Sequence, residues 1–172
     1  MEQLNRLDLP AWLARLGAVF EHSPWVAEGA WRRKERFGSF ASADELHRAM
    51  MRTVQEASPE MQLALVRAHP ELAGGEALTV DSTSEQGRLG FNRLCQAEVE
   101  RMKDLNRRYC EKFGFPCIVA LRLHANRASV MDEMARRLGN NAETELAGAL
   151  EQIGHITRGR LDKLLGEGLR EG

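Results

Sequence analysis

The sequence has few cysteines, almost no net charge and no long apolar run, and each absence excludes a class of protein. Its three cysteines, Cys95, Cys110 and Cys117, are odd in number and form no CxxC pair, so neither a disulfide framework nor a zinc site is indicated. The 24 basic and 25 acidic side chains give a net charge of −1, which predicts no nucleic-acid partner. The longest aliphatic runs, such as residues 117–121, are too short to span a bilayer, so no membrane segment is expected.

The remaining composition is that of an ordinary globular protein. The N-terminus lacks the basic-then-apolar pattern of a signal peptide, so we expect a cytoplasmic location. A chain of 172 residues without repeats or a linker signature is most simply a single domain, residues 1–172, large enough to bury its own core.

Apolar residues at helical spacing predict an all-α bundle of about seven or more helices. The expected helices begin near Pro10, Pro24, Ser42, Ser58, Thr83, Arg127 and Asn141. The helix from about Thr83 is expected to run to Phe113, where Gly114 follows as a stop signal. The run after it, residues 115–121, is apolar at every position and therefore has no solvent-facing side, so it predicts one buried extended segment.

The least helix-like stretch, residues 67–91, carries the first candidate for chemistry. Pro70 forces His69 out of the helical region, so the preceding helix should end near Ala68, and Gly74 and Gly75 then break the backbone. Irregular loops of this length are often functional. His69 is either a general acid or base, or a helix-terminal histidine that meets the last carbonyls of its helix; spacing alone favours the second interpretation. The other four histidines have no partner at metal-ligand spacing, so no metal site is predicted.

Two further polar features stand out. Ser82 and Glu85 have the spacing of a capping box, with Ser82 as N-cap, while Gln86 has no such duty. Amide groups of a first helical turn can also meet a ligand carboxylate. Arg160 falls on the apolar stripe of the last helix, where it either forms a buried ion pair, for which Glu71 and Glu98 are the candidate partners, or holds a substrate carboxylate. With no phosphate-binding loop, nucleophile elbow or metal cluster, these residues indicate a cofactor-free pocket.

Several motifs together resemble the decarboxylase family that acts on 2-oxo-4-hydroxy-4-carboxy-5-ureidoimidazoline (OHCU), the last intermediate between urate and allantoin. They are His69-Pro70-Glu71-Leu72-Ala73-Gly74, Leu78-Thr79, Ser82-x-x-Glu85-Gln86, Phe113-Gly114-Phe115-Pro116, Arg137-Leu138-x-Asn140 and Ile156-x-x-x-Arg160-Leu161. The resemblance covers most of the chain from His69 to Leu165. The N-terminal third fits in length and helical character only.

The resemblance implies an all-helical, cofactor-free decarboxylase that forms a homodimer and yields (S)-allantoin and CO2. Carried over to this chain, it implies that His69, Glu85 and Arg160 are catalytic. The implied substrate-binding residues are Pro70, Ser82, Gln86, Cys117, Ile118, Val119, Ala120 and Leu121. Cys117 stands where a large apolar residue such as phenylalanine is common in the family, and residues 87–90 read Gly-Arg-Leu-Gly where Ala-Gly-Leu is more usual.

Two other hypotheses stay open at this stage. A non-enzymatic helical module that docks a protein partner would explain the helices equally well, although it would not explain His69, the Glu85-Gln86 pair and Arg160 in one chain. A family member shifted to a related imidazoline or ureido substrate is the other, and Cys117 is the residue that suggests it.

Overall fold

The computed structural model describes residues 1–74 and 80–167, and all regular structure in these ranges is helical. Nine α-helices, one short 3-10 helix and no strand in the described ranges confirm the all-α prediction. In the same ranges, no helix is both long and apolar enough to cross a membrane. The chain divides into two compact units, one of residues 1–68 with the chain from residue 157, the other of residues 69–156.

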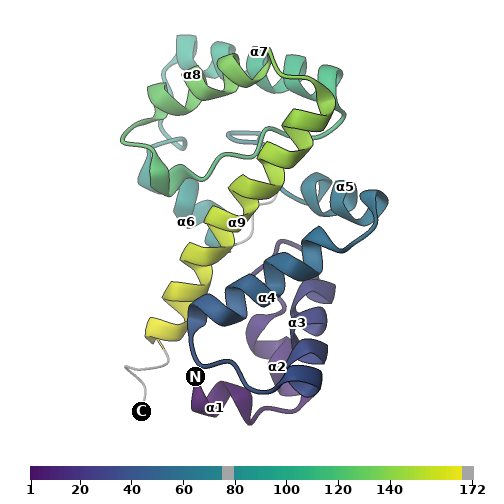
Figure 1. Ribbon diagram of the computed structural model, residues 1–172. Coiled ribbons are helices and arrows are strands. Elements are labelled where there is room, and N and C mark those ends of the chain that lie inside the picture. The colour runs from purple at the N-terminus through teal and green to yellow at the C-terminus, as the bar shows by residue number, and fades with distance from the viewer. Residues whose placement is uncertain (75–79, 168–172) are drawn as a thin grey trace. The chain divides into compact units, whose positions relative to one another are not determined.

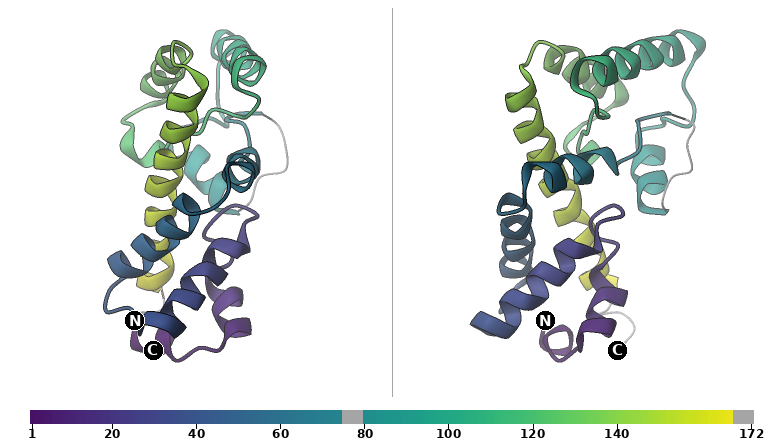
Figure 2. Two further views of the ribbon diagram at one scale, coloured as in Figure 1. Left: turned by 45° about the vertical axis from the view of Figure 1, so that its right-hand side comes forward. Right: turned by 90° about the vertical axis from the view of Figure 1, so that its right-hand side faces the viewer.

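The first unit is built on three consecutive helices. Its elements are α1 (Glu2–Asn5), α2 (Leu9–Leu16), α3 (Pro24–Phe37), α4 (Ala43–Gln55), α5 (Pro59–Arg67) and the last part of α9 (Ala142–Glu167). Helix α3 packs against both α2 and α4 (Figure 2). Trp12, Leu16, Leu46 and Met50 are fully buried, and Trp12 Nε1 donates to the carbonyl of Ala27 over 2.8 Å. An aromatic ring whose polar atom is paired in this way can lie in a core without an energetic penalty.

Most helix starts in this unit are those that the sequence predicts. Side-chain oxygens of Asp8, Ser42 and Ser58 cap α2, α4 and α5 by accepting from backbone N–H groups two or three residues into the helix. Within α5 the buried residues are Leu65 and Val66, whereas Met61 is 42% exposed.

The second unit is described from residue 69 to residue 156, apart from residues 75–79. It contains α6 (Val80–Arg88), α7 (Gln96–Phe113), the 3-10 helix η1 (Leu121–Leu123), α8 (Arg127–Arg137) and the first part of α9. Helices α7 and α8 contact each other (Figure 1). Between α7 and η1 the chain has no regular structure, and residues 115–121 are all buried, which confirms the buried extended segment.

The predicted long helix from Thr83 to Phe113 is wrong, because the chain breaks between α6 and α7. Gly90 adopts a positive φ of 74°, in the left-handed region that glycine enters at low cost. A new helix then starts at Gln96, where the carboxylate of Glu98 accepts from the N–H of the N-cap residue Cys95 over 2.9 Å. Apolar periodicity did not reveal the break because Phe91 remains buried inside the turn.

Some expectations concern parts of the chain that the structure does not describe. The backbone break at Gly75 and the Leu78-Thr79 pair lie outside the described residues.

Candidate active site

His69 lies at the exit of α5, as its place before a proline predicts. The helix ends at Arg67, and the N–H of the C-cap residue Ala68 still donates to the carbonyl of Ala64. Pro70 follows and prevents the helix from continuing. His69 is only 7% exposed. Burial of an imidazole, rather than its exposure on a frayed helix end, is the arrangement expected of a residue with a specific task.

The backbone after His69 is held by two side chains from other helices. Gln86 of α6 accepts through Oε1 from the N–H of Ala73 over 3.0 Å, and Asn106 of α7 donates through Nδ2 to the carbonyl of Leu72 over 2.8 Å. Ala73 has a φ of 53°, a left-handed conformation that non-glycine residues rarely adopt. Strained backbone of this kind persists only where its surroundings hold it, and it is common at functional sites.

Helix α6 brings the three other predicted polar residues onto one face. Ser82, Glu85 and Gln86 are spaced i, i+3 and i+4, so their side chains project from the same side of the helix. Ser82 and Gln86 are buried and Glu85 is half-buried. The N-cap role predicted for Ser82 is wrong: α6 already begins at Val80, so Ser82 is its third residue and the Ser82–Glu85 pair is no capping box.

The buried extended segment is tied to α6. Arg88, at the end of α6, donates through Nη2 to the carbonyl of Leu121. All five residues that the resemblance assigns to the substrate here, Cys117, Ile118, Val119, Ala120 and Leu121, are at most 5% exposed. Burial raises the pKa of the Cys117 thiol to about 12, so this side chain stays a neutral thiol at physiological pH. The loop after His69, α6 and this segment are therefore connected by hydrogen bonds within one unit.

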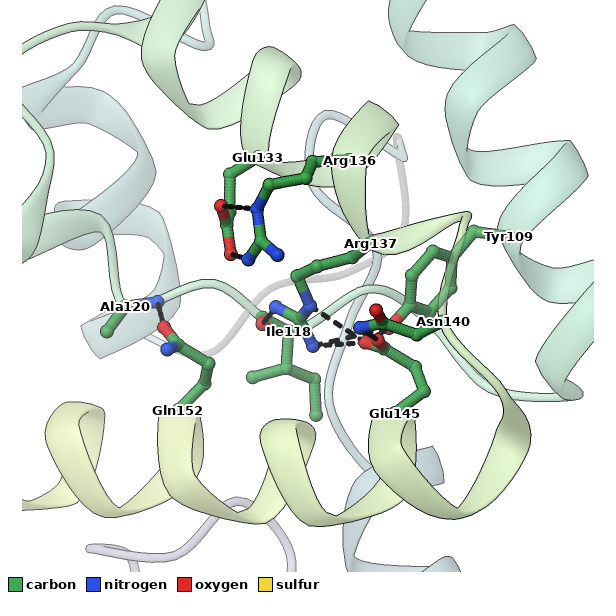
Figure 3. A network of polar contacts seen from close by, with 9 residues as sticks. All are labelled: Tyr109, Ile118, Ala120, Glu133, Arg136, Arg137, Asn140, Glu145 and Gln152. Atoms are coloured by element: carbon green, nitrogen blue, oxygen red, sulfur yellow. Dashed lines mark hydrogen bonds and ion pairs between the residues drawn. The ribbon is translucent and has the colours of Figure 1, made fainter.

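A buried polar network supports the same segment from α8 and α9 (Figure 3). Arg137 donates through Nη1 to the carbonyl of Ile118 over 2.6 Å and through Nε to Glu145 Oε1 over 2.8 Å. Glu145 also accepts from the hydroxyl of Tyr109 and, through Oε2, from Asn140 Nδ2 over 2.7 Å. Burial raises the pKa of Tyr109, so its hydroxyl remains a donor. A fully buried carboxylate with these donors satisfies the requirement that buried charges be paired.

Arg160 belongs to the other unit, where its predicted burial is confirmed and its predicted partner is not. The side chain is 5% exposed, and its Nη1 lies 2.6 Å from Oε2 of Glu21, itself buried. Of the two acids suggested from the sequence, Glu71 accepts from the thiol of Cys110 and Glu98 pairs with Arg127. Glu21 was missed because it lies in a non-helical turn after α2, where apolar periodicity gives no information about which side chains are buried.

Asn106, Tyr109 and Glu145 are the buried residues here that sequence reasoning did not single out, whereas Arg137 and Asn140 appear in a family motif without an assigned role. Two signals existed. Asn106 and Arg137 occupy positions that turn inward among apolar neighbours of their helices, and Glu145 is in register with the buried residues Ala149 and Ile153 at i+4 and i+8. The more apolar residues Leu146 and Leu150, one position further along, are only half-buried.

The chemistry available in this region is acid–base and hydrogen-bonding chemistry. The available groups are the imidazole of His69, the carboxylate of Glu85, the amide of Gln86, the hydroxyl of Ser82 and the backbone groups of the buried extended segment. In the described part of the chain, no group of three or more His, Cys, Asp or Glu side chains is placed to hold a metal ion.

Comparison with known proteins gives the same family throughout the chain. The family model for OHCU decarboxylase matches residues 5–162. A 2-oxo-4-hydroxy-4-carboxy-5-ureidoimidazoline decarboxylase of Haloferax volcanii is 39% identical over 161 residues, which cover 94% of this chain and 93% of the relative. The same-named protein of Mus musculus is 32% identical and covers 96% of this chain and 93% of its own.

A solved structure agrees in fold and sequence. The crystal structure of (S)-allantoin synthase matches 95% of this chain with a TM-score of 0.78 and 30% identity. The present chain spans 53% of that protein, so the match concerns about half of it.

Proposed function

The chain belongs to the OHCU decarboxylase family, and we propose that it converts OHCU into (S)-allantoin and CO2 in the degradation of urate. The single observation that carries the proposal is the family match over residues 5–162, which includes His69, the α6 residues, the extended segment and Arg160. The alternative of a non-enzymatic docking module has no specific observation in its favour.

The reaction needs little from the protein because the substrate supplies its own electron sink. The carboxylate that leaves is attached to a ring carbon next to a ring C=N bond. When the C–C bond breaks, CO2 departs and the electron pair passes toward the ring nitrogen. One proton is then taken up on the carbon that carries the ureido group, while the neighbouring C–OH becomes C=O and its hydroxyl proton passes to the ring nitrogen. The face of the carbon that is protonated determines whether S or R allantoin forms. The protein has to orient the carboxylate, deliver the proton on one face and exclude water.

We assign these tasks residue by residue. His69, whose imidazole pKa is ordinarily near neutrality, is the proton carrier. Arg160 binds the substrate carboxylate with its guanidinium group. Gln86 fixes the loop after His69 through its Oε1, which leaves its NH2 group as the donor toward substrate. Glu85 meets the ureido group or sets the charge state of His69, and Ser82 lies one turn before Gln86 on the same helix face.

Pro70 and the extended segment shape the site in this proposal. Cys117 to Leu121 contribute apolar walls and backbone groups, and the small neutral thiol of Cys117 leaves more room than a phenylalanine. A preference for a related ureido substrate would arise at this position. Cofactor independence, action as a single domain, a cytoplasmic location and a homodimeric state remain part of the proposal on the strength of the family resemblance.

The proposal is tested in an assay that generates the unstable substrate OHCU in the presence of the protein. Urate is converted in situ to OHCU by the two preceding enzymes, and circular dichroism follows the appearance of optically active allantoin. With the protein present, the signal of the S form should rise in proportion to protein concentration. Slow formation of racemic allantoin at the spontaneous rate, whatever the protein concentration, would reject the function.

A further inference from the structure

The extended segment before η1 is a buried stretch of backbone without a strand partner in the described chain. Extended chain of this kind must find other partners for its N–H and C=O groups. Three side chains provide them. Arg137 donates to the carbonyl of Ile118, Gln152 accepts from the N–H of Ala120 over 2.8 Å, and Arg88 donates to the carbonyl of Leu121 (Figure 3 shows the first two).

These contacts lie on two sides of the segment. In an extended chain, backbone groups of alternate residues point to opposite sides. The C=O of Ile118 and the N–H of Ala120 face α8 and α9, which carry Arg137 and Gln152. The C=O of Ala120 accepts from the N–H of Leu123 in the 3-10 turn, and the C=O of Leu121 accepts from Arg88 of α6. Because the C=O and N–H of a trans peptide point in opposite directions, the N–H and C=O of Val119 turn away from Arg137 and Gln152.

The peptide groups of Val119 have no hydrogen-bond partner in residues 1–74 and 80–167, although Val119 is only 4% exposed. Buried backbone groups are nearly always paired. The N–H and C=O of Val119 are an adjacent donor and acceptor on one edge of the chain. A ureido or lactam group of a bound substrate has the complementary C=O and N–H and can form hydrogen bonds with both.

The contacts from α8 are rigidly supported. Arg137 is 3% exposed and is fixed by Glu145, which is 0% exposed and also accepts from Tyr109 and Asn140. Tyr109 is the only tyrosine of the chain. A guanidinium held in this way fixes the position of the Ile118 carbonyl. The side-chain amide oxygen of Gln152 fixes the N–H of Ala120, two residues later.

We propose that Arg137 and Gln152 are positioning residues for the decarboxylation: they hold Ile118 and Ala120 from behind so that Val119 keeps its N–H and C=O directed at the substrate. The inference rests on the proposed function. It assigns a task to two side chains on the far side of the segment from α6. Misplacing the segment by about 1 Å is expected to cost up to roughly 100-fold in rate, since reacting groups must be held closely.

Gln152 gives the cleanest test, because it is half-buried and its loss leaves no charge behind. Gln152→Leu removes the acceptor for the Ala120 N–H, and Gln152→Glu keeps an acceptor in the same place. We expect Gln152→Leu to lower kcat by roughly tenfold to 100-fold and to lower the fraction of S product. The protein should stay folded with a melting temperature lower by a few degrees, because the buried N–H of Ala120 loses its acceptor. Gln152→Glu should restore most of the kcat and most of the S fraction. Wild-type kcat and wild-type stereoselectivity in Gln152→Leu would overturn the proposal.

Arg137 permits a second, independent test by chemical rescue. Its side chain lines a surface groove of about 760 Å3 that Asn140 and Gln152 also line, so a small solute has a route to the position of its guanidinium. Arg137→Ala should lose activity and regain part of it with low millimolar guanidinium, whereas Arg136→Met should behave as wild type. Arg136 is the matched control because it is the preceding residue, lines the same groove and, among the described residues, forms its ion pair with Glu133 on its own helix.

The results separate this inference from the function on which it rests. If the wild-type protein does not produce (S)-allantoin, the proposed function has failed. If the wild-type protein does so and Arg137→Ala folds, is inactive and gains nothing from guanidinium while Gln152→Leu is normal, only the positioning role has failed.

Discussion

A charged side chain on a buried helix face needs a partner of opposite charge, and Arg160 has one in Glu21. Both side chains are buried, and Nη1 of Arg160 lies 2.6 Å from Oε2 of Glu21. Removing one member strands the other without water, which costs about 3–5 kcal/mol, whereas replacing both by apolar residues is often neutral. The same arginine is assigned to the substrate carboxylate, so structure and function have to be separated by experiment.

Double substitution achieves that separation. Arg160→Met should lower the free energy of unfolding by about 3–5 kcal/mol, and Glu21→Leu in the same chain should recover most of the loss. Activity should remain very low in both variants because neither can bind the carboxylate with a guanidinium. Urea titration and steady-state kinetics provide the two readouts. Return of activity together with stability in the double variant would make Arg160 a purely structural residue.

His69 poses the same question with a simpler answer. His69→Ala should lower turnover by roughly two to four orders of magnitude, the usual contribution of a positioned acid or base. The melting temperature should change little if the residue is not a structural cap. His155→Ala is the control, since His155 is half-buried in the same unit, its imidazole lies beside Glu151 on its own helix, and its other partner, Arg122, bonds to its backbone carbonyl, which the substitution keeps. A large fall in melting temperature with turnover retained would make His69 a structural residue.

The turn between α6 and α7 shows how one side chain can organise an element boundary. Glu98 accepts from the N–H of Cys95 at the start of α7 and from Nε of Arg127 over 2.6 Å at the start of α8. The hydrogen bonds from Arg127 and from Cys95 lower the pKa of Glu98 from 4.5 to about 2. Its carboxylate therefore favours the folded state fully above pH 4.5, and this contribution disappears as the pH falls from 4.5 to about 2.

Glu98→Gln should consequently reduce the acid sensitivity of the fold. The urea concentration at the unfolding midpoint should fall more between pH 6 and pH 3 in the wild-type protein than in the variant. The reason is that the variant has no carboxylate to protonate at this position. Glu100→Gln, an exposed neighbour on α7, should follow the wild type. Equal losses in the wild type and Glu98→Gln would show that the ion pair does not contribute to stability.

Residues close together in the sequence predict most helices of this fold correctly. The errors arise where an element depends on contacts between residues far apart in the sequence. Caps at Asp8, Ser42 and Ser58 are decided by neighbours in sequence, and they are correct. The break after α6 depends on contacts of Arg88 and Glu98 with residues about 30 positions away. The position of His69 at the end of a helix is predictable because Pro70 follows it. The partners of Arg160 and Arg137 lie on other elements, so the spacing of apolar residues along one helix does not predict them.

At the scale of the whole molecule, the chain carries the OHCU decarboxylase family pattern across both units. In the reaction proposed for it, the ring C=N accepts the electrons that other decarboxylases pass to a bound cofactor. The protein's contribution is then orientation and protonation on one face.

Cofactor independence is directly testable. Prolonged dialysis against a strong chelator should leave kcat unchanged, because the proposed reaction routes no electrons through a metal. Activity is measured before and after dialysis, with and without added Mg2+, Mn2+ or Zn2+. Loss of activity that one metal restores would require a different mechanism.

The most direct measurement of the central claim compares three proteins under one assay. OHCU is generated from urate in situ, and circular dichroism records the initial rate of (S)-allantoin formation with the wild type, with His69→Ala and with Arg136→Met. The account predicts a rate proportional to protein for the wild type and Arg136→Met, and a rate near the spontaneous one for His69→Ala. Equal rates of S product from the wild type and a folded His69→Ala variant would contradict it.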